Sequence, residues 1–259
     1  MNLVYLIEDT AQSDGVRVVL AQSDALIARG HRVRIVTKGL PLTWRRSSAE
    51  WIYVDDFHEY DTSEDDIVVP SSDSPVLREY PIVDDEFFHT RGRRENDPPR
   101  VLLCGNEVSD GYSAVAHARW FHQKLELVRV SAWAPSREEP LDTVQEFHVA
   151  LTSDELSRLV HSCDILIAPD EAFSLSAPQA IAAGLACALS STPWHRSFDE
   201  PNDYALFAPE GNAVELGERL IELLGDDDLR NRLRTRGKEV AEQWRSEAVT
   251  TELERFFNQ

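Results

Sequence analysis

The chain has 259 residues, a formal net charge of −20 at pH 7 and 28% charged residues. This length exceeds one typical domain of about 100–150 residues, so the chain can bury two modest cores. The acidic balance argues against DNA or RNA as a partner, because affinity for nucleic acid depends on neutralising phosphates with lysine and arginine.

No stretch reaches the roughly 18 consecutive apolar residues that a transmembrane segment needs, and Met1 to Glu8 lacks the basic start of a signal peptide. Cys104, Cys163 and Cys187 lie in apolar contexts rather than in C-x-x-C pairs, which is typical of reduced, buried thiols. We therefore expect a cytoplasmic protein without a transmembrane segment.

The first part of the chain alternates strand and helix. Apolar residues at helical spacing predict a helix from Val16 to Arg29, which Gly30 ends. Ser13, Asp14 and Gly15 precede this helix, and a single glycine there fits either a plain turn or a ligand-binding loop. The expected strands of this part are 3–7, 32–37, 51–54 and 66–69. Residues 71–99 then turn polar and contain four prolines, which predicts a linker.

The alternation of strand and helix resumes at Arg100. Thr152 and Glu155 form a capping-box pattern, with Leu151 and Leu156 as its hydrophobic staple, and so mark a helix start. The other expected elements are strands at 101–105, 126–132, 145–150 and 204–208, and helices at 113–124, 153–161, 213–224 and 228–244.

This alternation predicts an α/β protein with doubly wound parallel sheets. We expect a shortened first domain at 1–78, a linker at 79–99 and a second domain at 100–259. Apolar residues form a stripe on the final segment, which fits either an ordinary core helix or a helix that docks on the first half. These residues are Val249, Leu253, Phe256 and Phe257.

The most informative stretch is 162–191, SCDILIAPDEAFSLSAPQAIAAGLACALSS. It reads as a buried strand, a polar loop, a helix of small residues and a second buried strand. That order places Glu171 and Ser174 outside the carboxyl ends of the strands, where a doubly wound sheet binds its ligands. Unpaired N–H groups at the helix start suit phosphate or sugar oxygens.

This stretch resembles the donor-site signature of family-4-type GT-B glycosyltransferases, usually E-G-F-G-L-P-x-x-E-A-x-A-x-G-x-P-V. The residues in register with it are Glu171, Phe173, Leu175, Ala180, Ala182, Gly184 and the pair Ala188–Leu189. A weaker match lies at 15–39, where GVRVVLAQSDALIARGHRVRIVTKG resembles the opening loop, helix and second strand of the same family.

The resemblance implies a GT-B architecture of two Rossmann-like halves, with the first half truncated. It implies transfer of a sugar, with retention, from a nucleotide-diphosphate-sugar donor to an unknown acceptor. In that family Glu171 would be the catalytic residue, hydrogen-bonded to the sugar hydroxyls, and neither a metal nor another cofactor is expected. The donor-binding residues implied are Gly15, Phe173, Ser174, Leu175, Gln179, Gly105 and Asn106.

The chain departs from the family pattern in two ways that affect donor binding. Gln179 replaces a glutamate that accepts hydrogen bonds from the ribose diol, which suggests roughly a tenfold loss of affinity. Glu107 and Asp110 stand where the family places an arginine or lysine beside the pyrophosphate. The cations that could replace it by folding back are Arg91, Arg93, Arg94 and Lys124.

Two functions remain open from the sequence. The first is a nucleotide-sugar-dependent glycosyltransferase. The second is a catalytically inactive pseudo-glycosyltransferase that acts as an accessory subunit or binding module, which the short first half and the residues Gln179 and Glu107 favour. A truncated first half exposes apolar strand edges, so a homo-oligomer or a larger glycosyltransferase partner is a further hypothesis.

Overall fold

The computed structural model divides the chain into two compact units. The first unit comprises Met1–Asp84 with Gln243–Gln259, and the second comprises Asp85–Glu242. The structure describes residues 1–70, 75–89, 95–105, 108–121, 124–132, 134–135, 139–169 and 173–258. The division near Asp84 falls inside the polar segment that the sequence marks as a linker.

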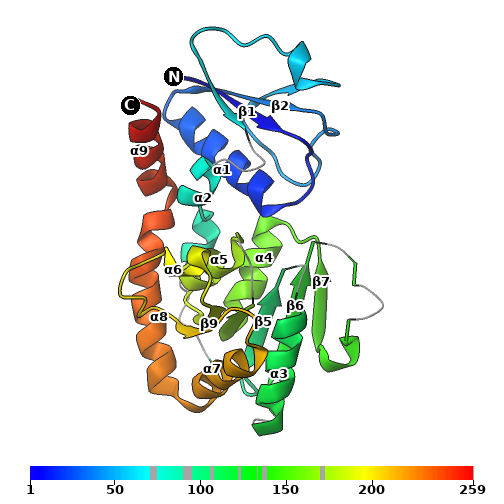
Figure 1. Ribbon diagram of the computed structural model, residues 1–259, viewed down its shortest axis with the longest axis vertical. Coiled ribbons are helices and arrows are strands. Elements are labelled where there is room, and N and C mark those ends of the chain that lie inside the picture. Colours follow the sequence, from blue (N-terminus) through cyan, green and yellow to red (C-terminus); the bar gives the residue numbers. More distant parts are fainter. Residues whose placement is uncertain are drawn as a thin grey trace. The chain divides into compact units, whose positions relative to one another are not determined.

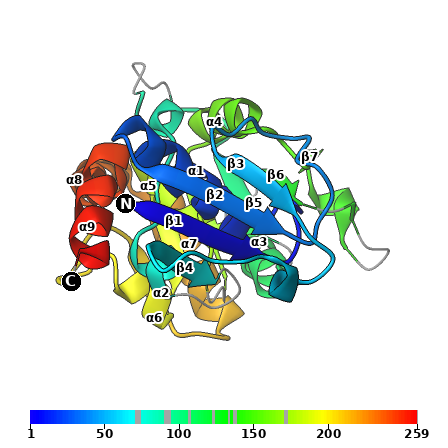
Figure 2. The ribbon, with the colours of Figure 1, turned by 90° about the horizontal axis from the view of Figure 1, so that it is seen from above.

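The first unit is built on a four-stranded parallel sheet in the order β3-β2-β1-β4 (Figure 2). Its strands are β1 (Asn2–Ile7), β2 (Arg32–Thr37), β3 (Glu50–Tyr53) and β4 (Asp66–Pro70). Its helices are α1 (Asp14–Ala28), α2 (Pro75–Glu79) and α9 (Ser246–Phe257), and a 3-10 turn lies at Phe57–Glu59. Both α2 and α9 contact α1, so the last helix of the chain completes the unit that the first strand begins.

A buried polar network fastens α1 between the sheet and α2. The Tyr5 hydroxyl donates to Gln22 Oε1 at 2.9 Å, and Gln22 Nε2 donates to the carbonyl of Tyr80 at 2.7 Å. Both side chains are 0% exposed, and burial raises the pKa of the Tyr5 hydroxyl. These bonds satisfy polar groups that would be costly to bury alone.

Loop side chains lie against the opposite face of this sheet. Arg34 lies over the ring of Tyr60 and Lys38 over the ring of Phe57, both in the connection between β3 and β4. Side chains alternate along a strand, so these cations point away from the face that holds Tyr5 and α1. A complete doubly wound unit carries helices on both faces, which agrees with a shortened first half.

The second unit is built on a six-stranded parallel sheet in the order β10-β9-β8-β5-β6-β7. Figure 1 labels β9, β5, β6 and β7 of this sheet from left to right. Its strands are β5 (Arg100–Cys104), β6 (Glu126–Ser131), β7 (Glu146–Val149), β8 (Ile165–Ala168), β9 (Ala186–Ser190) and β10 (Leu206–Ala208). Its helices are α3 (Ser109–Phe121), α4 (Ser153–His161), α5 (Ser176–Ala182), α6 (Pro193–Arg196), α7 (Ala213–Gly225) and α8 (Asp227–Ala241). The expectation of an α/β protein with parallel sheets is confirmed.

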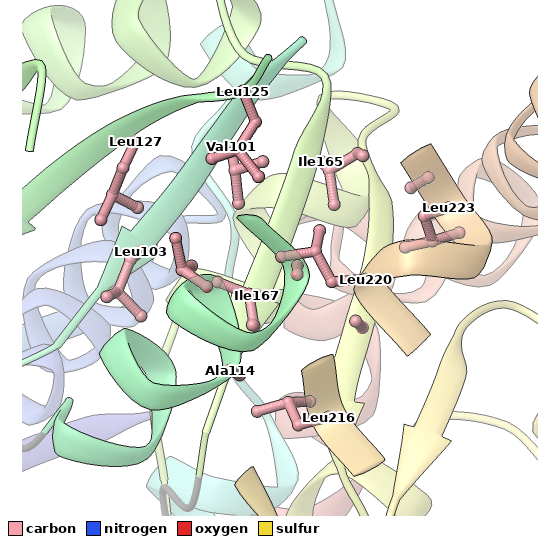
Figure 3. Close-up of a cluster of buried hydrophobic side chains, with 14 of the residues drawn as sticks. Val101, Leu103, Ala114, Leu125, Leu127, Ile165, Ile167, Leu216, Leu220 and Leu223 are labelled. Atoms are coloured by element: carbon pink, nitrogen blue, oxygen red, sulfur yellow. The ribbon is translucent and has the colours of Figure 1, made fainter. Parts of the chain in front are cut away.

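The core of the second unit lies between the sheet and the pair α3 and α7. Figure 3 shows Val101 and Leu103 of β5 and Ile167 of β8 pointing toward Ala114 of α3 and Leu220 of α7. All five are 0% exposed. Helices α4 and α5 belong to the other face, because their connections run across the sheet in the opposite direction and right-handed crossovers place them there.

A cluster of charged side chains joins the segment before β5 to α8. Glu95 accepts hydrogen bonds from Arg230, at 2.5 Å, and from Arg234. The Asp164 carboxylate, which is 2% exposed, accepts from Asn96 Nδ2 and from the Arg100 N–H, both at 2.8 Å. The two guanidinium groups are nearly buried, so Glu95, together with Asp227 at 2.5 Å from Arg230, supplies their compensating charge inside the unit.

Several element boundaries differ from the expectation. Helix α3 begins at Ser109 rather than at 113, and its first turn includes Gly111, where a Cβ would lie 2.5 Å from the Leu103 side chain. The helix expected at 228–244 ends at Ala241, and a 3-10 turn follows it over Glu242–Trp244. The short helices α2 and α6 are too brief to show a periodicity in the sequence.

Candidate functional site

The candidate site lies where the winding of the second sheet reverses. Strands β5 and β8 are neighbours, with Leu103 opposite Ile167. Strands β6 and β7 continue beyond β5, whereas β9 and β10 continue beyond β8. Ligands of doubly wound sheets bind outside the carboxyl ends of the strands at such a switch point. Gly105 follows β5 at this edge, and the loop Phe173–Leu175 follows β8.

Gly105 turns the chain sharply at the end of β5. Its φ angle is 116°, a conformation that residues with a side chain rarely adopt. The glycine is therefore required by the backbone itself. Asn106, which the sequence paired with it as a donor-binding residue, lies outside the described residues, as does Glu107.

The loop Phe173–Leu175 has a defined internal structure. Ser174 Oγ accepts a hydrogen bond from the Ser176 N–H at 3.0 Å and lies 2.8 Å from Ser176 Oγ. Ser174 is 5% exposed and Leu175 is 2% exposed. Their side chains thus shape the loop from within, while Phe173 is only half-buried. The expected catalytic residue, Glu171, lies outside the described residues.

Gln179 lies one helical turn after this loop, on α5. Its N–H donates to the Leu175 carbonyl at 2.9 Å, and the residue is 7% exposed. Helix α5 is seven residues long and buried along most of its length. Small residues fit that environment, because Ala177 and Ala180 are both 0% exposed.

An aromatic residue from the next strand connection reaches the loop. Trp194, in α6 after β9, donates its indole N–H to the Ser174 carbonyl at 3.1 Å. Its ring centroid lies 4.9 Å from that of Phe173. The sequence did not indicate this contact. The Thr-Pro pair before Trp194 is the local signal, since Thr192 caps α6 and Pro193 opens it.

Two arginines supply positive charge near the carboxyl ends of the strands. Arg129 of β6 is 0% exposed, and its guanidinium lies 3.4 Å from Glu139. Glu139 also accepts a hydrogen bond from the Tyr112 hydroxyl at 3.5 Å. Burial raises the pKa of this hydroxyl, although the positive charge of Arg129 acts to lower it. Arg196 is exposed, lies 3.9 Å above the ring of Phe207 and donates to Ser191 Oγ at 2.7 Å.

Comparison with known proteins places this geometry in context. Residues 132–240 match the family model of group 1 glycosyl transferases. The structure is similar to WaaG, a glycosyltransferase involved in lipopolysaccharide biosynthesis, with a TM-score of 0.70, 13% identity and coverage of 97% of this chain and 98% of that chain. The fold is GT-B. No curated protein sequence matches the chain.

Two further GT-B structures agree. A glycosyltransferase from Rickettsia africae ESF-5 matches with a TM-score of 0.71 and 12% identity, covering 99% of this chain and 97% of that chain. A sucrose-phosphate synthase from Thermosynechococcus elongatus matches with a TM-score of 0.70 and 13% identity, covering 100% and 99%. These likenesses show the GT-B fold, and the family match adds a likeness to group 1 glycosyl transferases over residues 132–240.

The GT-B frame separates the expected site residues into two groups. Phe173, Ser174, Leu175 and Gln179 lie within the matched residues 132–240 and close together in the second unit. Gly15 belongs to the first unit, as the second residue of α1, whose N-cap Ser13 accepts from the Val16 N–H. A Cβ added at Gly15 would meet nothing within 4 Å, so packing does not require a glycine there.

Lys124 is not a cation of this site. It precedes β6, so it lies at the amino ends of the parallel strands, on the edge opposite to Gly105 and Phe173. The candidates Arg91, Arg93 and Arg94 lie outside the described residues. The sequence did not identify Arg129 or Arg196, because the position of an arginine relative to a sheet edge depends on strand pairing.

The first sheet of the GT-B fold also has an ordered carboxyl edge. A Cβ on Gly39 would lie 2.7 Å from the Thr10 backbone nitrogen, so only glycine allows the turn after β2 to approach the loop after β1. Thr10 Oγ1 donates to the Leu40 carbonyl at 2.7 Å, and the Trp44 indole N–H donates to the Thr10 carbonyl at 2.9 Å.

Within the described residues, no helix combines the length and apolar character needed to cross a membrane.

Proposed function

We propose that this protein transfers a sugar from a nucleoside diphosphate sugar to an acceptor, as a family-4-type enzyme that retains the configuration of the transferred sugar. One observation carries the proposal: the loop Phe173–Leu175 lies at the switch point beside β5, inside the residues 132–240 that match group 1 glycosyl transferases. The pseudo-glycosyltransferase alternative gains no support from the fold, which extends over 97–100% of the chain in the three structures compared.

Each group in the proposed site has a distinct task. We propose that Gly105 and Asn106 after β5 and Phe173, Ser174 and Leu175 after β8 surround the donor. Ser174 and Leu175 would act through the main chain, since their side chains are buried. Gly15 of the first unit would contribute through its backbone, next to which there is open space.

The proposed chemistry depends on charge stabilisation rather than on a metal. The diphosphate leaving group gains negative charge as the sugar bond breaks, and fixed positive groups stabilise it. We propose that Arg196 supplies positive charge at this edge, because its guanidinium is exposed and held by Ser191 and Phe207. Glu171 would hydrogen-bond the sugar, and Gln179 would accept from the ribose hydroxyls.

Titration with UDP, GDP and ADP, followed by incubation with the corresponding nucleotide sugars, tests this function. We expect one nucleotide series to bind and its nucleotide sugar to be hydrolysed slowly, with water taking the place of the acceptor, to give the free sugar and the nucleoside diphosphate. Glu171→Gln should lower turnover by at least a hundredfold while leaving diphosphate binding within a few fold. Binding of none of the three series by the folded protein would refute the proposal.

Gln179→Glu is the matched gain-of-binding variant. A charged acceptor contributes about 1.5–3 kcal/mol to a hydrogen bond against about 0.5–1.5 for a neutral one, so this variant should tighten diphosphate binding by about tenfold. Calorimetric titration of the two forms side by side measures the change. Unchanged affinity would remove Gln179 from the proposed ribose contact.

We further propose that the reaction takes place in the cytoplasm. The three cysteines all lie within the described residues and form no disulfide, which fits a reducing compartment. Self-association or a larger glycosyltransferase partner remains a hypothesis, which a mass measurement in solution tests directly. The acceptor is to be identified by screening candidates once the donor is known.

A further inference from the structure

Trp194 links two separate strand connections at the proposed donor site. The loop Phe173–Leu175 follows β8, and α6 follows β9. The indole N–H of Trp194 donates to the Ser174 carbonyl at 3.1 Å, across a sequence separation of 20 residues. Because a peptide group is planar, a fixed carbonyl also fixes the plane of the bond joining Ser174 to Leu175.

The ring of Trp194 continues this support. It lies 4.9 Å from the Phe173 ring at 52° and 4.8 Å from the Phe198 ring at 89°. These separations are those of favourable aromatic pairs. Phe173 is half-buried, so the pair with Trp194 sets the position of the ring that this loop presents at the surface.

On the side away from Phe173, Trp194 packs against buried residues. Phe198 is 5% exposed and lies 6.0 Å from the ring of Tyr204, which is 1% exposed. The Tyr204 hydroxyl donates to the His195 carbonyl, and His195 Nδ1 donates to the Ser190 carbonyl at the end of β9 at 2.8 Å. Helix α6, and Trp194 with it, is therefore fixed to the end of β9. Trp194 in turn fixes the loop after β8 through its hydrogen bond to Ser174.

We propose that Trp194 is a positioning residue for the donor: it holds the Phe173–Leu175 loop in the shape that receives a nucleoside diphosphate sugar. This inference rests on the proposed function, since it assigns a task within that site. A binding loop held within about 0.5 Å by neighbouring side chains loses less entropy when its ligand binds than a loop that must be ordered first. The sugar-bearing diphosphate, rather than the acceptor, is the ligand that depends on Trp194.

The test compares Trp194→Phe with Trp120→Phe. The first variant keeps an aromatic ring and removes the N–H donor to Ser174. The second makes the same chemical change at an exposed tryptophan of α3, which is 83% exposed. We expect Trp194→Phe to weaken binding of whichever of UDP, GDP and ADP the wild type binds by about five- to tenfold, the loss of one neutral hydrogen bond. Trp120→Phe should leave that affinity within twofold.

Steady-state kinetics separate positioning from a merely structural role. In Trp194→Phe the KM for the nucleotide sugar should rise by a similar factor, while kcat stays within twofold. A lower melting temperature with unchanged diphosphate affinity would overturn the inference and leave Trp194 as a packing residue.

Phe173→Leu provides a second variant that leaves the indole hydrogen bond in place. It should also weaken diphosphate binding, and the double variant with Trp194→Phe should lose less than the product of the two single effects, because the two residues act on one loop. Fully independent effects would contradict the proposal. If the wild-type protein binds none of the three diphosphates, the proposed function fails and this inference fails with it. If the wild type binds one of them and neither variant changes that affinity, the inference alone is overturned.

Discussion

Glu95 is a carboxylate that pairs with two nearly buried guanidinium groups, of which Arg230 also pairs with Asp227. Arg230 and Arg234 are 5% and 9% exposed, and Glu95 is 37% exposed. The sequence could not reveal this cluster, because Glu95 lies in the polar segment read as a linker and its partners are 135 and 139 residues away. Charge clusters of this kind depend on the tertiary fold and have no local pattern.

Replacing this carboxylate should destabilise the second unit. We expect Glu95→Gln to lower the free energy of unfolding by about 2 kcal/mol, below the roughly 3–5 kcal/mol for breaking a fully buried pair, because Glu95 is partly exposed to solvent screening. Urea denaturation at pH 7 measures it. Glu50→Gln, which breaks the exposed pair with Arg32, serves as the control and should cost less than about 0.5 kcal/mol.

The same carboxylate should make stability depend on acid. Hydrogen bonds from Arg230, with further ones from Arg234, lower the pKa of Glu95 to about 2 from an ordinary value of 4.5. Its contribution is complete above the unfolded pKa and is lost as the pH falls from 4.5 toward 2. The stability difference between wild type and Glu95→Gln should therefore be constant from pH 6 to 8 and shrink below pH 4. A difference that persists unchanged at pH 3 would contradict this assignment.

The sequence could predict the place of several candidate site residues in the fold. Gly105, Phe173 and Gln179 follow strands whose apolar runs are clear in the sequence, and their part in donor binding stays a prediction. Trp194 could not be connected to Ser174, because its hydrogen bond runs between two loops whose shapes depend on α6. Catalysis by Glu171 stays a prediction.

Among the elements, helix starts were predicted better than short helices. The capping box at Thr152 and Glu155 is present: the Glu155 N–H donates to Thr152 Oγ1 at 3.4 Å, and Glu155 Oε2 accepts from the Thr152 N–H at 2.9 Å. Such a motif is local in sequence and needs no tertiary partner. Strand 204–208 was expected too long, since pairing with β9 extends only from Leu206 to Ala208.

The turn between β7 and α4 contains a strained residue. Ala150 has a φ of 51°, in the left-handed region that costs a residue with a Cβ about 1–2 kcal/mol. Ala150→Gly removes that strain but adds flexibility to the unfolded chain, so we expect a net gain of about 0.5–1 kcal/mol. Thermal unfolding followed by circular dichroism measures the gain.

The matched control for this change is Ala116→Gly. Ala116 is exposed in the interior of α3, where glycine should instead destabilise by about 1 kcal/mol. Opposite signs for the two substitutions support the strain at Ala150. A loss of stability at both positions would show that the turn tolerates its alanine without cost.

At the scale of the whole molecule, the fold class could be read from the order of strands and helices alone. What the alternation could not predict is that α9 belongs to the same unit as β1. Its apolar stripe fitted two interpretations equally, and the choice depends on the partners of Leu253 and Glu254. Glu254 lies 2.8 Å from His31 and 3.5 Å from Arg29, and these bonds join the last helix to the end of α1.

A substitution in α9 should therefore weaken a segment more than 200 residues earlier in the chain. Leu253 is 0% exposed, so Leu253→Ala should cost about 2–4 kcal/mol through the cavity it leaves. Hydrogen exchange should accelerate in β1 and α1. Val214→Ala, at a residue of α7 that is 60% exposed, should change stability by less than about 0.5 kcal/mol. Exchange in β1 and α1 that Leu253→Ala leaves unaltered would contradict this coupling.

The placement of α9 also sets an order of events during synthesis on the ribosome. Domains generally fold as they emerge from the exit tunnel, starting with the part made first. Here the sheet made first stays without its last helix until all of Asp85–Glu242 has been translated. The unit translated second can consequently fold ahead of the unit translated first, and the amino-terminal sheet stays incomplete until α9 has been translated.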